Sequence, residues 1–269
     1  MKQSRTLGFT LVEVIVVVSL VAVLLAILAP TLQAARRQAR GAVCRTNLRQ
    51  LNYANLSYTV DNDGFFVPGA KDLWNQAGGL YRWHGVREHS DLPFEPTRGP
   101  LASYLDSGRV NECPERIRFV RGGLWEDNFE QGCGGYGYNM TYLGSRLWEG
   151  DADPIRPYER TTRSTEVGSS GRTLMFADCA ISRQDGSYLE YSFAEPPFCV
   201  IAGRVMTGFY MSPTLHFRHQ GRVNIGWADG HVDSQTMAPM DSVNVYGVES
   251  ATMSLGWFDP ADNSPFDLK

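Results

Sequence analysis

Three histidines and two aspartates in the second half of the chain could bind a metal ion or act in catalysis. His216 and His219 are three residues apart, His231 lies across a predicted hairpin, and Asp178 and Asp229 supply carboxylates. Two histidines at this spacing with a third across a hairpin permit a zinc site. The alternative is a structural role, in which His219 donates a hydrogen bond that fixes its loop against the hairpin.

Motifs of catalytic sites are missing from the sequence. It has no His-Glu-x-x-His and no Gly-x-Ser-x-Gly. We therefore expect no catalytic residue and no resident cofactor, with the histidines in a structural role and a bound cation as the alternative.

A hairpin is predicted near residues 223–235. The pair Asp229-Gly230 stands between two strand-like runs, and Asp-Gly favours a two-residue turn because both positions tolerate positive φ. Such a turn would place Trp227 opposite Val232. One half-buried face would then carry four apolar side chains, Val223, Ile225, Trp227 and Val232.

Five cysteines leave at least one unpaired within the chain. Cys113 and Cys133 are twenty residues apart in loop-rich sequence, and a second pair, Cys179 and Cys199, has the same separation. These four cysteines allow three connectivities, and the sequence alone does not choose among them. We favour a Cys113–Cys133 disulfide in an oxidising compartment, where it would stabilise the fold by about 3 kcal/mol. Cys44 lies on the apolar face of a predicted helix and is expected to be a buried thiol.

An apolar run of 21 residues, 9–29, opens the chain and contains one carboxylate, Glu13. As a helix the run would be about 31 Å long, enough to cross a bilayer. An acid at mid-depth costs roughly 2.5–3.5 kcal/mol on insertion scales, so Glu13 needs a partner. Since no basic residue lies within the run, the free α-amino group of a cleaved chain is a candidate partner.

The stretch Gly8-Phe9-Thr10-Leu11-Val12-Glu13 resembles the processing site of type IV pilins and type II secretion pseudopilins. The resemblance implies that a prepilin peptidase cuts after Gly8 and methylates the new N-terminal amine of Phe9. It also implies that Glu13 neutralises the N-terminal amine of a neighbouring subunit during filament assembly. The physical account agrees, because two costly buried charges then become one pair.

A C-terminal pattern also resembles a large pseudopilin-like bacterial family. Its signature is a histidine, nine residues and then Asp-Gly, which His219, Asp229 and Gly230 match here. By analogy with major pseudopilins, the bound cation would be calcium, with zinc as the other choice. The resemblance is dense at both ends of the chain and thin from 145 to 170 and after 235.

These patterns predict an α+β protein with a pilin-like fold. Residues 1–8 would be a cleaved leader, and 9–58 a long helix whose first part, 9–29, spans the membrane. Residues 59–269 would form a globular domain with an antiparallel β-sheet that packs on the helix. The net charge of −4 gives no indication of nucleic-acid binding.

The resemblance implies a structural subunit of a type II secretion or type IV pilus-like filament in the bacterial inner membrane. Its partners would be other pilin or pseudopilin subunits, the prepilin peptidase and an inner-membrane assembly platform. The chain would cross the membrane once and place its globular domain in the periplasm or on the filament surface. The larger number of arginines after the apolar run argues for the opposite orientation.

A second reading is a membrane-anchored minor pilin-like protein whose globular domain binds a surface polysaccharide or another ligand. Tryptophan rings stack on sugars, although buried tryptophans are the more common case. Four of them stand in loop-like sequence and could form a platform: Trp74, Trp83, Trp125 and Trp148.

Overall fold

The computed structural model describes residues 10–73, 79–115, 117, 119–121, 130–151, 153, 155–240 and 242–269. The chain divides into two compact units, residues 1–40 and residues 41–269. It is an α+β protein with a long apolar N-terminal helix and a globular unit of antiparallel sheets, as predicted.

The first unit is helical over its described residues. It contains the start of α1 (Leu11–Asp61), a helix of 51 residues that continues into the second unit. All side chains from residue 11 to residue 30 are exposed, and most of them are aliphatic. Among the described residues, α1 is the one helix long and apolar enough to cross a membrane.

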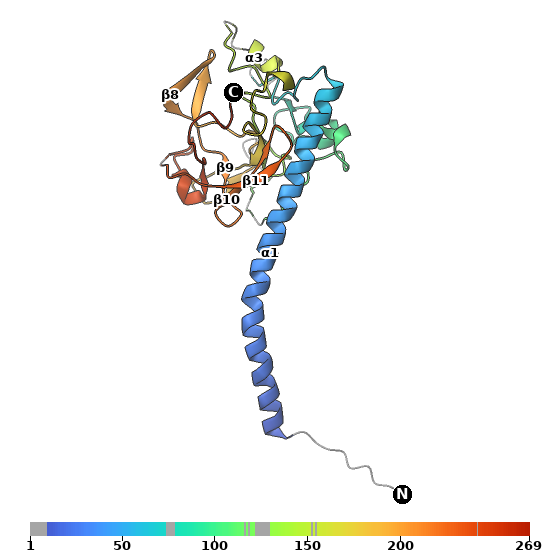
Figure 1. The fold of residues 1–269 in the computed structure, drawn as a ribbon, viewed down its shortest axis with the longest axis vertical. Coiled ribbons are helices and arrows are strands. Elements are labelled where there is room, and N and C mark those ends of the chain that lie inside the picture. Colours follow the sequence, from blue (N-terminus) through green and yellow to red (C-terminus); the bar gives the residue numbers. More distant parts are fainter. Residues whose placement is uncertain are drawn as a thin grey trace. The chain divides into compact units, whose positions relative to one another are not determined.

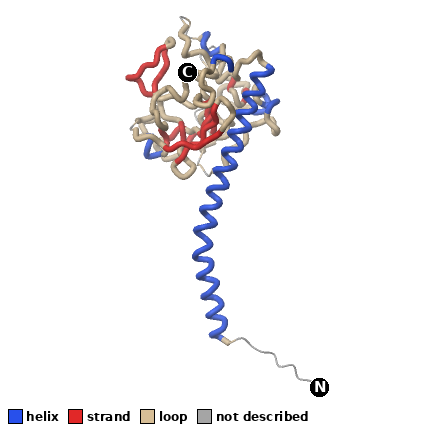
Figure 2. Tube along the Cα trace, in the orientation of Figure 1, coloured by secondary structure: helices blue, strands red, loops and turns tan. Residues whose placement is uncertain are grey.

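The second unit begins with the C-terminal part of α1 and then consists mainly of short strands and loops (Figure 2). The elements after α1 are, in chain order, β1 (Tyr81–Arg82), β2 (Gly85–Val86), η1 (Pro96–Arg98), η2 (Ala102–Tyr104), β3 (Tyr136–Tyr138), α3 (Arg156–Glu159), η3 (Ser164–Glu166), β4 (Leu174–Asp178), β5 (Ile181–Ser182), β6 (Tyr188–Leu189), β7 (Phe198–Ile201), β8 (Arg204–Tyr210), β9 (Leu215–His216), β10 (Arg222–Trp227), β11 (Val232–Thr236), η4 (Ser250–Met253) and β12 (Leu255–Gly256). Figure 1 labels five of them, α3, β8, β9, β10 and β11.

The central sheet has four antiparallel strands in the order β11-β10-β4-β3. All five residues of β4 are buried, and so are residues 223–227 of β10. Strands buried on both faces need a cover on each side. The helix provides one cover, and the C-terminal segment contributes to the other through Phe258, whose ring meets Trp227 edge-on at 6.1 Å.

The helix covers the sheet with the face that carries Cys44, which the sequence predicts to be apolar. Cys44, Leu48, Leu51 and Asn55 are buried in the second unit. Polar side chains on this face form hydrogen bonds with backbone groups. For example, Asn55 Oδ1 accepts a hydrogen bond from the Val67 amide at 3.0 Å. The helix ends at Asp61, three residues beyond the predicted Tyr58, and the turn that follows uses Gly64 at φ +82°.

The predicted hairpin is formed by β10 and β11, but its predicted register is wrong by one residue. Val232 pairs with Gly226, and the Trp227 amide donates to the His231 carbonyl at 3.0 Å. The turn therefore contains three residues, 228–230, and the last of them, Gly230, has φ +95°. Because of this shift Val232 shares a face with Gly226 and not with Trp227.

Candidate functional site

Four potential metal ligands from distant parts of the chain meet in the interior of the second unit. Cys44 lies on α1, Cys113 in the segment before β3, Asp178 at the end of β4 and His219 in the turn before β10. One ligand atom of each lies within 4.8 Å of the other three. We call these four residues the buried cluster.

The Asp178 carboxylate lies at the centre of the buried cluster. Its Oδ1 accepts from Cys44 Sγ at 3.1 Å and from Arg218 Nη2 at 2.9 Å. Its Oδ2 accepts from the Asn224 amide at 3.0 Å and lies 3.2 Å from His219 Nε2. Burial alone would raise the pKa of Asp178, but Arg218 and the His219 hydrogen bond outweigh it and hold this pKa well below its usual range.

The same contacts shift the pKa values of the His219 imidazole and of the two thiols, Cys113 and Cys44. Burial opposes the charged imidazole, yet hydrogen bonds to Asp178 and Cys113 raise the pKa of His219 to about 9. A hydrogen bond with Cys44 lowers the pKa of Cys113 to about 5 against its burial, helped by the charge of Arg218. Burial raises the pKa of Cys44. Cys113 is therefore the more acidic of the two thiols, and its sulfur lies 3.4 Å from His219 Nε2.

Only two of the five predicted metal candidates lie in the buried cluster, Asp178 and His219. His216 is buried against the Tyr188 ring, with centroids 4.7 Å apart, and burial lowers its pKa to about 3. His231 and Asp229 pair with each other at the hairpin turn, where Nδ1 lies 2.6 Å from Oδ1 and both side chains are substantially exposed.

The histidine and Asp-Gly of the C-terminal pattern lie at opposite ends of β10. His219 precedes the strand, and Asp229 and Gly230 form part of the turn after it. His219 contacts Asp178 on β4, which in turn accepts the Asn224 amide of the hairpin. His219 thus connects its loop to the sheet through the Asp178 carboxylate.

The predicted Cys113–Cys133 disulfide is absent from the structure. All five cysteines fall in the described ranges and all are free. Cys113 turns toward His219 instead, while Cys133 is fully buried elsewhere in the core. The second pair, Cys179 and Cys199, is also unbridged.

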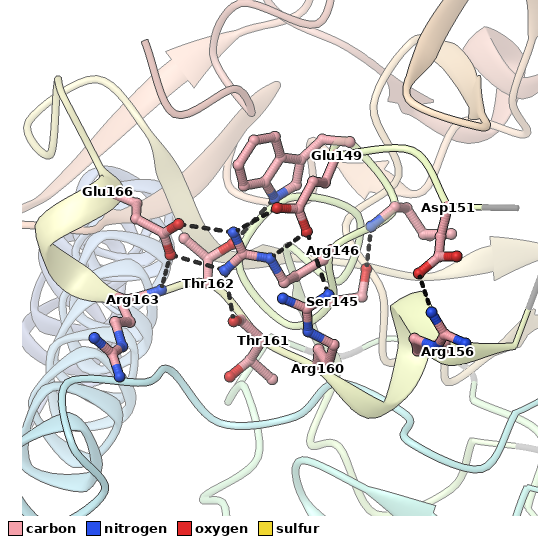
Figure 3. Close-up of polar contacts among 12 residues, drawn as sticks. Ser145, Arg146, Glu149, Asp151, Arg156, Arg160, Thr161, Thr162, Arg163 and Glu166 are labelled. Atoms are coloured by element: carbon pink, nitrogen blue, oxygen red, sulfur yellow. Dashed lines mark hydrogen bonds and ion pairs between the residues drawn. The ribbon is translucent and has the colours of Figure 1, made fainter. Parts of the chain in front are cut away.

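A second polar cluster surrounds Arg146 (Figure 3). Its guanidinium donates to both carboxylate oxygens of Glu149, at 2.7 and 3.1 Å, and of Glu166, at 2.7 and 2.9 Å. A fifth hydrogen bond reaches the Thr161 carbonyl at 3.3 Å. All five donors of Arg146 are therefore used within the fold, which makes this cluster a structural clamp.

The predicted tryptophan platform does not form from the two tryptophans that the structure describes. Trp83 is fully buried, and its indole donates to the Ser192 carbonyl at 2.8 Å. Trp148 is partly buried and donates to Thr162 Oγ1 at 3.1 Å. Trp74 and Trp125 lie outside the described residues.

Exposed aromatic side chains occur instead along β8, which borders a groove of about 550 Å³. Phe209 and Tyr210 line this groove and are 68% and 54% exposed. Glu195 also lines it, although it is itself buried, and burial raises its pKa to about 7. The groove offers an apolar surface of a size that suits a small ligand.

At the N-terminus the structure describes Glu13 but not Gly8 or Phe9, which lie outside the described residues. The Thr10 amide and hydroxyl both donate to Glu13 Oε2 at 2.8 Å, and the Glu13 amide donates back to Thr10 Oγ1 at 3.3 Å. This reciprocal pair is a capping box, and it starts α1. Glu13 thus has a local role in starting the helix, besides the role that the pilin resemblance implies.

Residues 3–29 match the family described as the prokaryotic N-terminal methylation motif. The match supports a type IV pilin-like family, whose members are processed at this motif and are structural proteins. It spans the apolar part of α1 and the residues before it. No curated protein and no solved structure shows a significant match to this chain.

Proposed function

We propose that this chain is a prepilin that becomes a structural subunit of a type II secretion or type IV pilus-like filament. The observation that carries the proposal is the methylation motif over residues 3–29, most of which forms the exposed apolar start of α1. Prepilin peptidase would cleave after Gly8 and methylate Phe9. Other pilin or pseudopilin subunits and an inner-membrane assembly platform would be its partners.

Residues 11–30 expose apolar side chains around the whole helix, which supports filament assembly by packing of this helix. A helix that is apolar on all sides is stable in lipid or among other helices. We infer that it first spans the inner membrane and then packs among copies of itself or related subunits. The globular unit would face the periplasm or the filament surface, because the leader must meet the peptidase on the cytoplasmic side.

Glu13 is the proposed assembly residue. Its carboxylate is exposed on the helix, and Oε2 is already held by Thr10. Within the membrane a fixed carboxylate favours a neighbouring cation, and the free amine of a mature Phe9 on the next subunit is such a cation. The capping box would hold the carboxylate ready for that partner.

The mass of the mature N-terminal peptide tests this proposal. Protein extracted from native membranes should begin at an N-methylated Phe9. In cells that lack the prepilin peptidase, the same chain should begin at Met1. A chain that keeps residues 1–8 in cells with an active peptidase would contradict the proposal.

One observation favours a second role, ligand binding by the globular unit. The groove beside β8 exposes the aromatic rings of Phe209 and Tyr210, and such rings bind sugars or other flat apolar ligands. Saturable binding of a polysaccharide by the detergent-solubilised chain, reduced by Phe209→Ala, would support this role. Binding that Phe209→Ala leaves unchanged would place the site elsewhere and remove the groove from consideration.

A further inference from the structure

We propose that the buried cluster of Cys44, Cys113, Asp178 and His219 binds one Zn²⁺ ion. The four residues supply two sulfurs, one nitrogen and one carboxylate oxygen within 4.8 Å of one another. The proposal does not depend on the assembly function, because it concerns only the interior of the second unit.

The spacing of the donor atoms is close to that of a tetrahedral zinc site, with two of three distances slightly short. Zinc bonds of about 2.0–2.3 Å at tetrahedral angles put neighbouring ligand atoms about 3.3–3.8 Å apart. His219 Nε2 lies 3.4 Å from Cys113 Sγ and 3.2 Å from Asp178 Oδ2. Cys44 Sγ lies 3.1 Å from the other oxygen, Asp178 Oδ1. Small side-chain movements would bring all four donors to bonding distance of one central ion.

The chemistry of the donors selects zinc over calcium. Calcium takes six to eight oxygen ligands, whereas thiolate and imidazole are ligands that zinc prefers. Of calcium and zinc, only zinc therefore fits these side chains. Four protein ligands also complete its coordination shell, which is typical of a structural site.

Charge balance also favours a divalent ion. Two thiolates and one carboxylate carry three negative charges, and the zinc ion contributes two positive charges. Arg218, which is buried and lies 2.9 Å from Asp178 Oδ1, supplies the third positive charge. The occupied site would thus be neutral overall, which limits the cost of burying its charges.

Neighbouring groups hold Asp178 in place by hydrogen bonds and flank His219 with a carboxylate. The Asn224 amide and Arg218 both donate to Asp178. The other ring nitrogen of His219, Nδ1, lies 3.9 Å from Glu115 Oε2. A carboxylate on that side of a histidine ligand favours the tautomer that presents Nε2 to the metal.

The ligands come from different elements of the second unit, so a bound ion would connect these elements. Cys44 is on α1 and Asp178 is on the central sheet, so one ion would join the helix to the sheet that it covers. Removal of the ion should therefore loosen the helical part of the second unit and lower the melting temperature.

The first test uses the full-length chain, purified in detergent after expression with added zinc. We expect one zinc ion per chain by elemental analysis. Replacement of zinc by Co²⁺ should give the absorption bands of a tetrahedral ion together with a thiolate-to-cobalt charge-transfer band. A protein that keeps no zinc and shows no such cobalt spectrum would overturn the proposal, as would octahedral cobalt without thiolate bands.

Variants identify the ligands. Cys44→Ser and His219→Gln should both lose stoichiometric zinc, whereas Cys199→Ser, which changes a free cysteine outside the cluster, should keep it. A chelator should lower the melting temperature of the wild-type chain and of Cys199→Ser.

The competing outcome is a disulfide between Cys44 and Cys113, whose sulfurs lie within 4.8 Å. Peptide mapping without reductant should yield both as free thiols once zinc is removed. A cross-linked peptide in the wild-type chain would overturn the zinc site. The N-terminal peptide from the same digest reports separately on cleavage after Gly8, so failure of one proposal is distinguishable from failure of the other.

Discussion

The side-chain amide of Asn52 on α1 packs directly against the bare backbone of Gly226 on β10. A Cβ atom at Gly226 would lie only 2.6 Å from Asn52 Nδ2. This close approach lets Asn52 Nδ2 donate to the carbonyls of Trp227 and His231, at 3.2 and 3.3 Å. One buried amide therefore ties the helix to both ends of the hairpin turn.

Gly226→Ala should destabilise the globular unit because the added methyl group meets the Asn52 amide. We expect a loss of about 1–3 kcal/mol in the free energy of unfolding, the usual cost of overpacking a core. Urea titration of the detergent-solubilised chain, followed by tryptophan fluorescence, measures it.

Gly208→Ala is the matched control, since a Cβ there meets nothing within 4 Å and its strand is exposed. Its effect should stay within about 0.5 kcal/mol. Combining Gly226→Ala with Asn52→Ala should cost less than the sum of the two single changes, because the clash needs both partners. Strict additivity would show that the two residues do not interact.

The sequence predicts the class of fold because its strongest signals are local. The apolar run, its single Glu13 and the Asp229-Gly230 turn are each contained in short windows. The hairpin was also predictable, but its register was not. The predicted register requires positive φ at both Asp229 and Gly230, and in the structure only Gly230 has it.

The buried cluster could not be predicted from spacing. Cys44 and Asp178 are 134 residues apart, and Cys113 and His219 are 106 apart. No local motif links residues on four separate segments. Histidine spacing instead pointed to His216 and His231, which the strands direct to other surroundings. Arg218, next to His219 in the chain, is a neighbouring cation that no pattern in the sequence singles out.

Arg146→Lys should destabilise the fold although it keeps the positive charge. An ammonium group has three donors and cannot form the paired bonds to Glu149 and Glu166. Leaving partners of a charged group unpaired costs about 1–3 kcal/mol, which chemical denaturation can resolve. The control is Arg156→Lys, because Arg156 is 58% exposed and its pairs with Asp151 and Asp153 are solvated (Figure 3 shows the first). Equal losses in both variants would argue against the clamp.

Glu195 should make the globular unit less stable as the pH rises from about 4.5 to about 7. Burial raises the pKa of Glu195 to about 7 in the folded state, whereas the unfolded value is 4.5. Between these values the folded state holds the extra proton, so its stability falls by up to about 1.4 kcal/mol per pH unit. Above pH 7 this contribution is constant.

The variant Glu195→Gln isolates this effect, because a neutral amide can still accept the Tyr191 hydroxyl at the position of Oε1. The stability of the wild-type chain relative to Glu195→Gln should decline from pH 5 to pH 7 and then level off. Denaturant titrations at a series of pH values give this difference directly. A difference that does not change with pH would mean that Glu195 titrates normally.

Glu13→Ala should abolish filament assembly without blocking cleavage. The proposed pairing leaves an unpaired N-terminal amine in the apolar bundle when the carboxylate is removed. An uncompensated buried charge costs about 3–5 kcal/mol, which corresponds to a loss of more than a hundredfold in association. Sheared-filament yield measures assembly, and the mass of the N-terminal peptide measures cleavage.

Two further changes separate the charge of Glu13 from its capping role. Glu13→Gln keeps a side chain that can close the capping box with Thr10 but has no charge, so it should fail to assemble like Glu13→Ala. Thr10→Val removes the hydroxyl that accepts a hydrogen bond from the Glu13 amide, and it keeps the Glu13 carboxylate. This variant should therefore assemble with only a modest loss of filament yield. The reverse pattern, with Glu13→Gln assembling and Thr10→Val failing, would assign Glu13 to capping and leave the N-terminal amine without its proposed partner.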